Sequence, residues 1–314
     1  MQQGKPILCV GTTPAVQRTM RFHRLAVDEV NRATEVLESP AGKSINVAQV
    51  LATLGKPVIA AGFLGGESGR FIGAQLQRQG VILDFVEVPF RTRVCTTAID
   101  IDQGTTTELV EESQVVASEY WQNLLDRIAV AAPRSAAIVL SGGLPPKAPQ
   151  GFYARCCELA NLHGIPVILD TRGEPLRLAM SSHPALVKPN RAELGEMMEE
   201  PVSTAEQLRR AVSLLLERGA QVALITMGAK GAMLASAKGF WSLAAPKVAV
   251  SNPIGSGDSV AAGYAAGLVD GMPLLDCAIL GIACGSANAM TPVPGCVHRD
   301  DVERLRREVV VVDM

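Results

Sequence analysis

The sequence lacks an excess of charge of either sign. Its 314 residues include 29 lysines and arginines against 31 aspartates and glutamates, a formal net charge of -2 with a pI of about 6.1. Proteins that bind nucleic acid or anionic membranes through their overall electrostatic field carry a basic patch or a basic pI. The composition therefore argues against nucleic-acid and membrane partners and favours a small-molecule partner.

Paired cysteine and histidine motifs are also missing. The seven cysteines form no CxxC pair, and no two of the four histidines have the HxxxH or HxxH spacing that would aim both at one metal. An odd number of unpaired cysteines is typical of reduced thiols in a cytosolic protein. We expect buried structural thiols, histidines without a metal role, and a cytoplasmic protein.

No segment is typical of a leader peptide or a membrane span. The first six residues lead directly into the apolar run Ile7-Leu8-Cys9-Val10, without the charged segment, apolar segment and cleavage site of a signal peptide. The apolar stretch 274–290 contains Asp276 and Asn288 and falls short of the ~20 unbroken apolar residues of a spanning helix. It predicts a buried helix, and secretion is not expected.

Short apolar runs alternate with amphipathic segments along most of the chain. The strand-like runs are 58–61, 137–140, 167–169, 186–187 and 222–226. Helical spacing of apolar residues occurs at 45–54, 70–79, 119–132, 151–163, 192–198, 205–217 and 259–269, and several of these segments are followed by a glycine: Gly55, Gly80, Gly164 and Gly219. This alternation predicts an α/β fold with a mostly parallel sheet between helices, and the chain is long enough to bury its core as one domain.

Two segments, at about 14–40 and 86–114, break this alternation. Residues 97–102 alternate in polarity and are followed by Gly104, a pattern that predicts antiparallel strands joined by a turn. We expect the two segments to pair into a small sheet outside the main one. A sheet with one open face needs a cover, either bound substrate or a second subunit, so we predict a homodimer through this sheet.

Two glycine-containing segments do not match the common phosphate-binding motifs. Ala41-Gly42-Lys43-Ser44 lacks the glycine that a P-loop has five residues before its Gly-Lys, since Leu37 stands there. Gly255-Ser256-Gly257 is not followed by the third glycine of a dinucleotide fingerprint. Both motifs are therefore excluded.

The run Asn252-Pro253-Ile254-Gly255-Ser256-Gly257-Asp258 predicts an anion-binding turn at the start of a helix. Its glycines let backbone N–H groups approach a ligand closely, and the helix N-terminus adds partial positive charge. Asp258 would then be either a catalytic base or an ordinary helix N-cap. The run alone does not decide between these roles.

Other motifs accompany this run in a recognisable order. Segments 41–48 and 252–258, the latter followed by Ala262-Gly263, resemble the two signatures of the PfkB branch of the ribokinase superfamily, with 141–145, 188–193 and 226–231 between them. The resemblance spans nearly the whole chain, and 252–258 together with Thr92-Arg93-Val94-Cys95 look most like the 1-phosphofructokinase and tagatose-6-phosphate kinase branch. It implies a ribokinase-like fold over 1–314: a three-layer αβα domain with a small β-sheet lid.

The resemblance implies ATP-dependent phosphoryl transfer. Asp258 would accept the proton of a sugar hydroxyl, while N–H groups of Ser256 and Gly257, with Gly255 shaping the turn, would stabilise the transferring phosphoryl group. Asn190 and Glu193 would hold Mg²⁺ largely through water. The alternative for this last pair is a helix N-cap with its capping-box partner.

The resemblance also assigns contacts with both substrates. Nucleotide-side residues would be Lys188, Asn190, Glu193, Thr226, Gly228, Gly231 and Asn288. Acceptor-side residues would be Gln17, Gly42, Lys43, Asn46, Arg93, Ser141 and Asp258. The planar guanidinium of Arg93 suits a phosphate already present on the acceptor, the alternative being a solvated surface arginine; for Asn288 the alternative is a satisfied buried amide. A monovalent cation is a further candidate cofactor.

Two departures from the family pattern fall on the acceptor side. Gln17 stands where a carboxylate is usual, so an amide with one accepting oxygen replaces two, and Ala41 and Ser44 replace glycines. The reaction class is therefore better defined than the acceptor: fructose 1-phosphate first, tagatose 6-phosphate or fructose 6-phosphate next. A kinase for an unphosphorylated sugar or nucleoside, and a non-catalytic regulator that binds sugar phosphates, remain alternatives.

Overall fold

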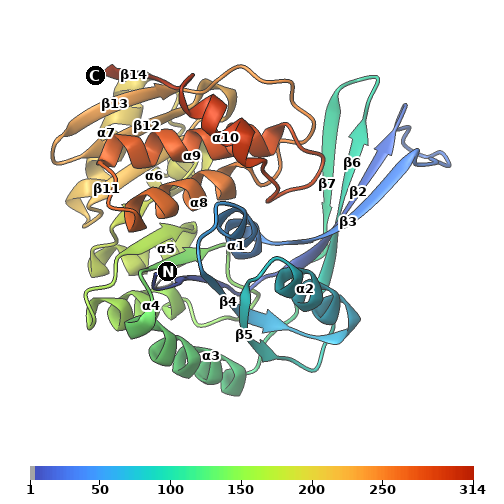
Figure 1. The fold of residues 1–314 in the computed structure, drawn as a ribbon, viewed down its shortest axis with the longest axis horizontal. Helices are drawn as coiled ribbons and strands as arrows, with labels where there is room; N and C mark the ends of the chain where they lie inside the picture. The colour runs from blue at the N-terminus through green and yellow to red at the C-terminus, as the bar shows by residue number, and fades with distance from the viewer. Residues whose placement is uncertain (1–3) are drawn as a thin grey trace.

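The computed structural model describes residues 4–314, and within that range the strands form a ten-stranded sheet and a separate four-stranded sheet (Figure 1). The large sheet has the order β14-β13-β12-β11-β10-β9-β8-β1-β4-β5. The strands β11, β10, β9, β8, β1, β4 and β5 run parallel to one another, which confirms the predicted mostly parallel sheet. The antiparallel strands β12, β13 and β14 at one edge were not expected. Residues 1–3, part of the predicted leaderless N-terminus, lie outside the described range.

The strands of the large sheet are short, and most are buried. They are β1 (Ile7–Gly11), β4 (Val58–Leu64), β5 (Ile82–Glu87), β8 (Ala137–Ser141), β9 (Val167–Asp170), β10 (Leu186–Val187), β11 (Val222–Thr226), β12 (Ala232–Ser236), β13 (Gly239–Ala244) and β14 (Val310–Asp313). The helices are α1 (Lys43–Thr53), α2 (Gly66–Arg78), α3 (Ser118–Ala131), α4 (Phe152–Asn161), α5 (Gly173–Ala179), α6 (Arg191–Met198), α7 (Ala205–Glu217), α8 (Ser256–Val269), α9 (Leu274–Ala289) and α10 (Arg299–Arg306).

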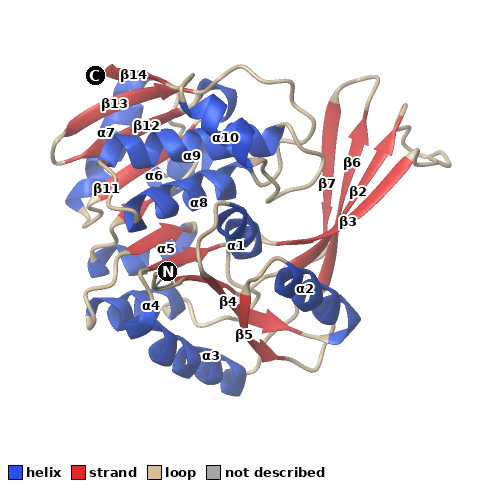
Figure 2. Cartoon of the chain, viewed as in Figure 1, coloured by secondary structure: helices blue, strands red, loops and turns tan. Residues whose placement is uncertain are grey.

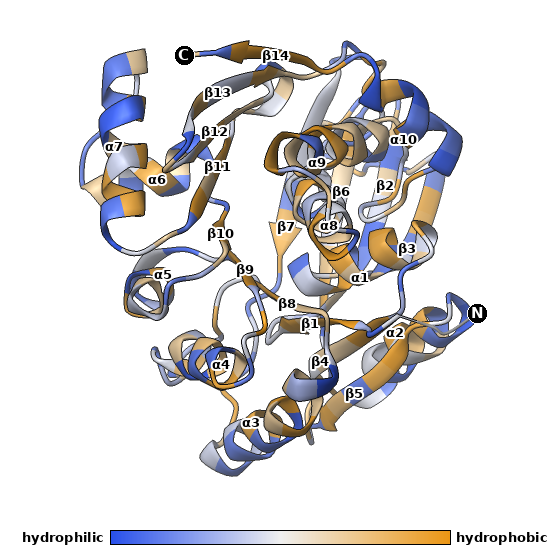
Figure 3. Cartoon of the chain, turned by 60° about the vertical axis from the view of Figure 1, so that its left-hand side comes forward, coloured by the Kyte–Doolittle hydropathy of each residue, from blue (hydrophilic) through white to orange (hydrophobic). Residues whose placement is uncertain are grey.

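Helices cover both faces of the large sheet (Figure 2). Alternate residues of a strand point to opposite faces, and in β1 Ile7 and Cys9 join the core beneath α1, α2, α8, α9 and α10, whereas Leu8 and Val10 join the core beneath α3, α4, α5, α6 and α7. Outer helices such as α3 and α7 carry both blue and orange segments in Figure 3, as expected of helices with one face on a sheet and the other in solvent. The molecule therefore has the predicted three layers.

The four-stranded sheet, called the lid sheet below, comes from the two segments predicted to break the α/β alternation. It consists of β2 (Ala15–Phe22), β3 (Glu35–Ala41), β6 (Arg93–Asp100) and β7 (Thr105–Val110), in the order β3-β2-β6-β7. The predicted turn at Gly104 joins β6 to β7, and β7 is exposed along its whole length. In Figure 1 this sheet extends away from the helical layers.

The carboxyl ends of the parallel strands lie at one edge of the large sheet and present several polar residues there. Strand β1 lies between β4 and β8, so the chain order reverses at this point, where open α/β sheets place their ligands. Ser141, Asp170 and Thr226 each end a strand, and Lys188 directly follows β10. The fold therefore brings together residues that are far apart in sequence.

Two composition-based expectations have a structural counterpart. Six of the seven cysteines are buried, and within the described chain each is a free thiol. No helix among residues 4–314 combines the length and the apolar character needed to cross a bilayer. The predicted buried helix at 274–290 is α9.

Candidate active site

The anion-binding turn forms as predicted at the start of α8. Gly255 is the N-cap, with a φ of 81°, and a Cβ there would lie 2.9 Å from Cβ of Pro294. Only glycine fits this left-handed, crowded position without strain. Within residues 4–314 no backbone carbonyl accepts from the N–H groups of Gly257 and Asp258, whereas Ser256 N–H donates to Pro253 O over 3.3 Å. The N–H groups free to bind an anion are therefore those of Gly257 and Asp258, whereas those of Ser256 and Gly257 were expected.

Asp258 is not a helix N-cap; it lies in the first turn of α8, and only 7% of its surface is exposed. Asn46 of α1 donates from Nδ2 to Asp258 Oδ2 at 2.7 Å. Burial raises the pKa of Asp258 to about 6; Lys43 opposes this, Asp170 adds to it, and Asn46 and Lys188 oppose it more weakly. Asp258 is thus ionised at neutral pH and able to accept a proton.

Asn288 faces the anion-binding turn and does not line the neighbouring cavity. Its Nδ2 donates to Ile254 O at 2.8 Å and to Ser256 Oγ at 3.3 Å, and its Oδ1 accepts from Gly295 N at 2.8 Å. The satisfied buried amide, given above as the alternative, is what the structure shows. Asn288 braces the turn, and a contact with adenine or ribose stays a prediction that this geometry does not favour.

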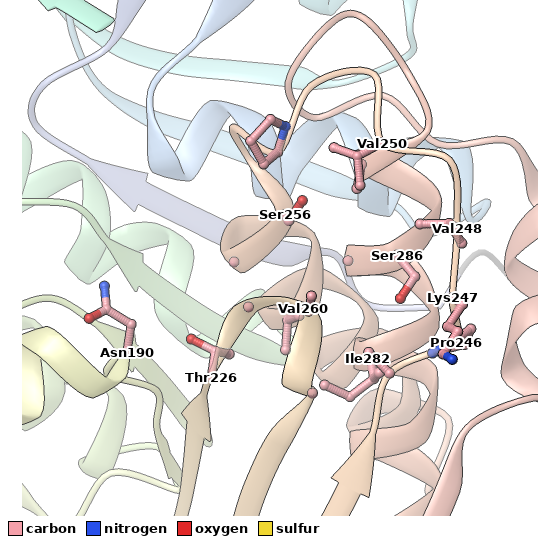
Figure 4. Close-up of a pocket in the computed structure, with 18 residues that line it drawn as sticks. Asn190, Thr226, Pro246, Lys247, Val248, Val250, Ser256, Val260, Ile282 and Ser286 are labelled. Carbon is pink, nitrogen blue, oxygen red and sulfur yellow. The ribbon is translucent and has the colours of Figure 1, made fainter. Parts of the chain in front are cut away.

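A cavity of about 550 Å³ opens beside the turn (Figure 4). Six residues predicted from the sequence line it: Asn190, Thr226, Gly228, Gly231, Ser256 and Gly257. In Figure 4 Asn190 and Thr226 lie across the cavity from the loop that carries Lys247 and Val250. Most of the remaining lining is apolar, from Ala245, Pro246, Val248, Val250, Pro253, Val260, Ile282 and Ala289. A polar end beside the free N–H groups and an apolar remainder suit a nucleotide.

Asn190 and Glu193 form the capping box of α6. Glu193 N–H donates to Asn190 Oδ1 at 2.9 Å, and Asn190 N–H donates to Glu193 Oε2 at 2.8 Å. One carboxylate oxygen, Glu193 Oε1, is left over, and it lies 3.4 Å from Lys43 Nζ. This donor set fits Mg²⁺ held largely through water, because the amide oxygen and one carboxylate oxygen already accept hydrogen bonds.

Asp170, a residue without a role in the sequence-based prediction, lies at the centre of the charged groups. Its Oδ1 is 3.2 Å from Lys43 Nζ and its Oδ2 is 3.2 Å from Lys188 Nζ. Burial alone would raise the pKa of this carboxyl, but Lys188 and Lys43 together hold it below its ordinary value. An aspartate that ends a buried parallel strand was the available sequence signal.

Some residues predicted to contact the acceptor have buried polar atoms without partners among residues 4–314. Within the described chain Ser141 Oγ and Asn46 Oδ1 have no hydrogen-bond partner and are inaccessible to solvent. Buried polar atoms are normally satisfied, so these two atoms keep unused hydrogen-bonding capacity. Gly42 caps α1 with a φ of 106°, and a Cβ on it would lie 2.9 Å from Pro14 Cα, so the chain at 13–15 rests directly against the start of this helix.

Arg93 is held in place by backbone carbonyls. Its Nη1 donates to Glu111 O and its Nη2 to Thr13 O, each at 3.0 Å, while Nε is buried without a partner. A guanidinium has five N–H donors, so donors remain for a ligand after these two bonds. The structure therefore makes a fixed, incompletely satisfied cation of Arg93, rather than a freely solvated side chain.

Gln17 lies on the same face of the lid sheet as Arg93, because Ala15 pairs with Arg93 and Gln17 with Cys95. Its Nε2 donates to Cys95 O at 3.2 Å and to Thr97 Oγ1 at 2.7 Å. A carbonyl can only accept, so the nitrogen must face Cys95 O, which leaves Oε1 as the end available to a ligand. The strand fixes one neutral acceptor at this position.

Ser44, part of the second departure from the family pattern, packs against the large sheet. Its side chain is buried, and a Cβ on Gly11 would lie 2.1 Å from Ser44 Oγ. The hydroxymethyl group therefore fills space above a glycine at the end of β1. Ala41, at the end of β3, is also buried. The side chain of Ser44, which we expected beside the sugar, therefore lies against β1.

Comparison with known proteins agrees with this geometry. The model of the pfkB family carbohydrate kinases matches residues 5–294. A candidate phosphofructokinase from Staphylococcus aureus superposes with a TM-score of 0.81 at 28% identity, over 98% of this chain and 99% of that one. Phosphofructokinase-2 from Escherichia coli, in complex with fructose-6-phosphate, gives 0.87 at 23% identity, over 96% and 98%. A candidate 1-phosphofructokinase from Thermotoga maritima gives 0.89 at 23% identity, over 98% and 99%.

The chain belongs to the pfkB family of carbohydrate kinases, and its fold is ribokinase-like. It is therefore an enzyme of the phosphotransferase class.

Proposed function

We propose that this protein transfers the γ-phosphoryl group of ATP to a hydroxyl of a sugar phosphate, fructose 1-phosphate first and tagatose 6-phosphate or fructose 6-phosphate next. The observation that carries the proposal is the position of Asp258. It lies at the free N–H groups of α8, one residue from the cavity-lining Gly257, and is bonded to Asn46 of the acceptor-side helix. A base between an anion-binding turn and a polar acceptor site is what hydroxyl phosphorylation needs.

The residues divide the chemistry as follows. Asp258 takes the proton as the acceptor oxygen bonds to the γ-phosphorus, and the bond to the β–γ bridging oxygen breaks to release ADP. The N–H groups of Gly257 and Asp258, together with Lys188, stabilise the negative charge on the transferring group. Gly255 and Asn288 hold the turn that aims these N–H groups.

Mg²⁺, held through water by Glu193 and Asn190, would neutralise charge on the nucleotide phosphates. Asn190 also pairs with Thr226 through an isolated bridge, which places the capping box beside the strand end that lines the cavity. The chain's own contribution here is to fix the orientation of the Glu193 carboxylate.

The acceptor class follows from the charges on the lid side. Arg93 is oriented by two carbonyls and keeps an unpartnered Nε. This cation is not needed for a neutral sugar or a nucleoside, whereas it suits a phosphate already on the acceptor. The fructose-6-phosphate complex of the Escherichia coli relative and the Thermotoga maritima candidate 1-phosphofructokinase support the same class.

A panel of acceptors tests the proposal. ADP release would be measured with ATP, Mg²⁺ and, in turn, fructose 1-phosphate, tagatose 6-phosphate, fructose 6-phosphate, the corresponding free sugars and a set of nucleosides. We expect kcat/KM to be highest for a sugar phosphate. A preference for a free sugar or a nucleoside would refute the acceptor class, and binding of sugar phosphates without turnover would indicate a regulator.

The pH profile should show the titration of Asp258. Because burial raises its pKa to about 6, the proton-accepting form is lost as the pH falls through that value, and kcat/KM should fall with it. Measuring kcat/KM between about pH 5 and 8 checks this in wild type, and the profile of Asp258→Asn should lack this fall at low pH, called the acid limb below. A profile that stays flat to the acid end would contradict the role of Asp258.

Gln17→Glu should raise KM for the best acceptor by about tenfold, because a carboxylate would oppose the Cys95 carbonyl and lose the two bonds that aim Oε1. Steady-state KM for acceptor and for ATP would be compared, and only the acceptor value should change. The matched control is Gln103→Glu in the exposed β6–β7 turn. An unchanged acceptor KM would show that Gln17 does not contact the sugar.

The lid sheet should be covered by a second copy of the chain. Leu109 of β7 and Val36 of β3 are 60% and 51% exposed and lie on the same face of the sheet, a pattern that points to an interface. Light scattering at micromolar concentration should give twice the 33.1 kDa chain mass. Leu109→Glu should shift the equilibrium toward the single chain, and a wild-type mass of one chain with and without substrate would refute the prediction.

A further inference from the structure

Asp170 is a buried carboxylate that binds two lysines from different parts of the chain. It has no exposed surface, Lys43 comes from the first turn of α1, and Lys188 follows β10 and is 3% exposed. Both Nζ atoms lie 3.2 Å from the carboxylate, one at each oxygen. The two lysines thus approach a single anion from opposite halves of the site.

The lysines reach different groups beyond Asp170. A Cβ placed on Gly257 would lie 3.5 Å from Lys188 Nζ, so this ammonium group is beside the anion-binding turn. Lys43 Nζ also contacts Glu193 Oε1 at 3.4 Å, and its helix carries Asn46, which bonds Asp258. Lys188 therefore lies beside the site of the transferring phosphoryl group, and Lys43 lies on the helix whose Asn46 bonds the base Asp258.

Electrostatics explains why an anion is needed between them. Two ammonium groups drawn this close repel each other strongly in a low-dielectric site, and a buried charge without a partner is strongly destabilising. Asp170 supplies one negative charge against two positive ones. Glu193 offsets charge at the Lys43 end, so the positive charge left for an incoming phosphoryl group is that of Lys188, beside the anion-binding turn.

We propose that Asp170 is a positioning residue for phosphoryl transfer: it fixes Lys188 beside the anion-binding turn and Lys43 beside the acceptor helix, so that one carboxylate aligns the two halves of the site. The inference rests on the proposed function. Asp170 acts through the lysines and contacts neither substrate.

Asp170→Asn is expected to lower kcat by about 100-fold, because the isosteric amide no longer attracts both ammonium groups. It should also move the acid limb of kcat/KM to lower pH. The charged groups facing Asp258 are Lys43, Lys188 and Asp170, and removing the one negative neighbour makes Asp258 easier to ionise. A purely structural role would lower thermal stability and leave kcat unchanged at a pH above this limb.

Matched variants separate positioning from folding. Asp84→Asn removes a carboxylate of β5 that is paired with Arg127 at 2.7 Å on another part of the sheet, and it should leave kcat and the pH profile unchanged. Asp170→Glu keeps the charge and should recover part of the lost kcat, and it replaces the asparagine variant if that one fails to fold. In Asp170→Asn/Lys188→Met the losses should overlap rather than multiply, because both changes act on one group.

The outcomes are distinguishable. If the wild type phosphorylates no sugar phosphate, the proposed function fails and this inference fails with it. If the wild type is active but Asp170→Asn keeps kcat within about threefold at a pH above the acid limb, the inference alone is overturned, because the position of the two lysines would then contribute little to stabilising the transferring group. A loss that multiplies fully with that of Lys188→Met would also overturn it.

Discussion

Asp258→Asn is expected to lower kcat by about 10²–10⁴-fold with little change in ATP affinity, because a general base acts on the chemical step. The asparagine can still accept the hydrogen bond from Asn46, so the loss should come from the missing base. Steady-state kinetics and calorimetric titration with ATP measure the two effects. A variant that keeps half of the wild-type kcat would refute the assignment.

The same variant should not be less stable. Because the folded-state pKa of Asp258 is raised to about 6, the carboxyl favours the folded state at low pH, and that contribution is lost as the pH rises through this value. A neutral asparagine removes the cost of the buried charge at neutral pH, which is at most ~3 kcal/mol by the pKa difference. Thermal unfolding should thus show an unchanged or higher Tm. Asp270→Asn, at the other end of α8, is the control, and it should keep kcat.

Arg93→Ala should raise KM for the phosphorylated acceptor by about 10- to 100-fold and leave KM for ATP nearly unchanged, because it removes charge-assisted hydrogen bonds worth roughly 1.5–3 kcal/mol. The guanidinium is already aimed by Thr13 O and Glu111 O, so the donors that remain after these two bonds can meet a phosphate without reorganisation of the side chain.

The neighbouring Arg91 provides the control for this prediction. It is exposed and pairs with the Glu111 side chain, so Arg91→Ala should affect neither KM. Equal effects of Arg93→Ala on the two substrates would indicate a general disturbance of the lid sheet, and the phosphate-binding role would then be wrong.

Local patterns in the sequence were sufficient to predict most of the fold. Apolar runs located the parallel strands other than β5, and the polarity pattern at 97–102 with Gly104 located the β6–β7 turn. The antiparallel edge was missed in two parts: the local hairpin of β12 and β13 was not picked out of its short apolar runs, and β14 is only four residues long and pairs with β13, which precedes it by more than sixty residues. Pairing over such a separation is set by tertiary packing and leaves little local signal.

The sequence predicted the motifs of the site but not the contacts between their side chains. Spacing alone indicated the capping box of Asn190 and Glu193 and the turn before Asp258. Spacing could not show that the Asn288 side chain points toward the anion-binding turn, because the direction of a helical side chain depends on packing. Asp170 was missed for a related reason: a single aspartate after a strand becomes informative only when the sheet places Lys43 and Lys188 on either side of it.

Phosphorus NMR of a complete reaction tests the central claim most directly. Wild-type protein would be mixed with ATP, Mg²⁺ and the best sugar phosphate of the panel, and the phosphorus signals would be followed to completion. We expect the γ-phosphate signal of ATP to be replaced, mole for mole with ADP, by a second phosphomonoester signal on the acceptor, and Asp258→Asn to give almost none. Formation of ADP with inorganic phosphate alone, or no loss of ATP with any sugar phosphate, would contradict the account.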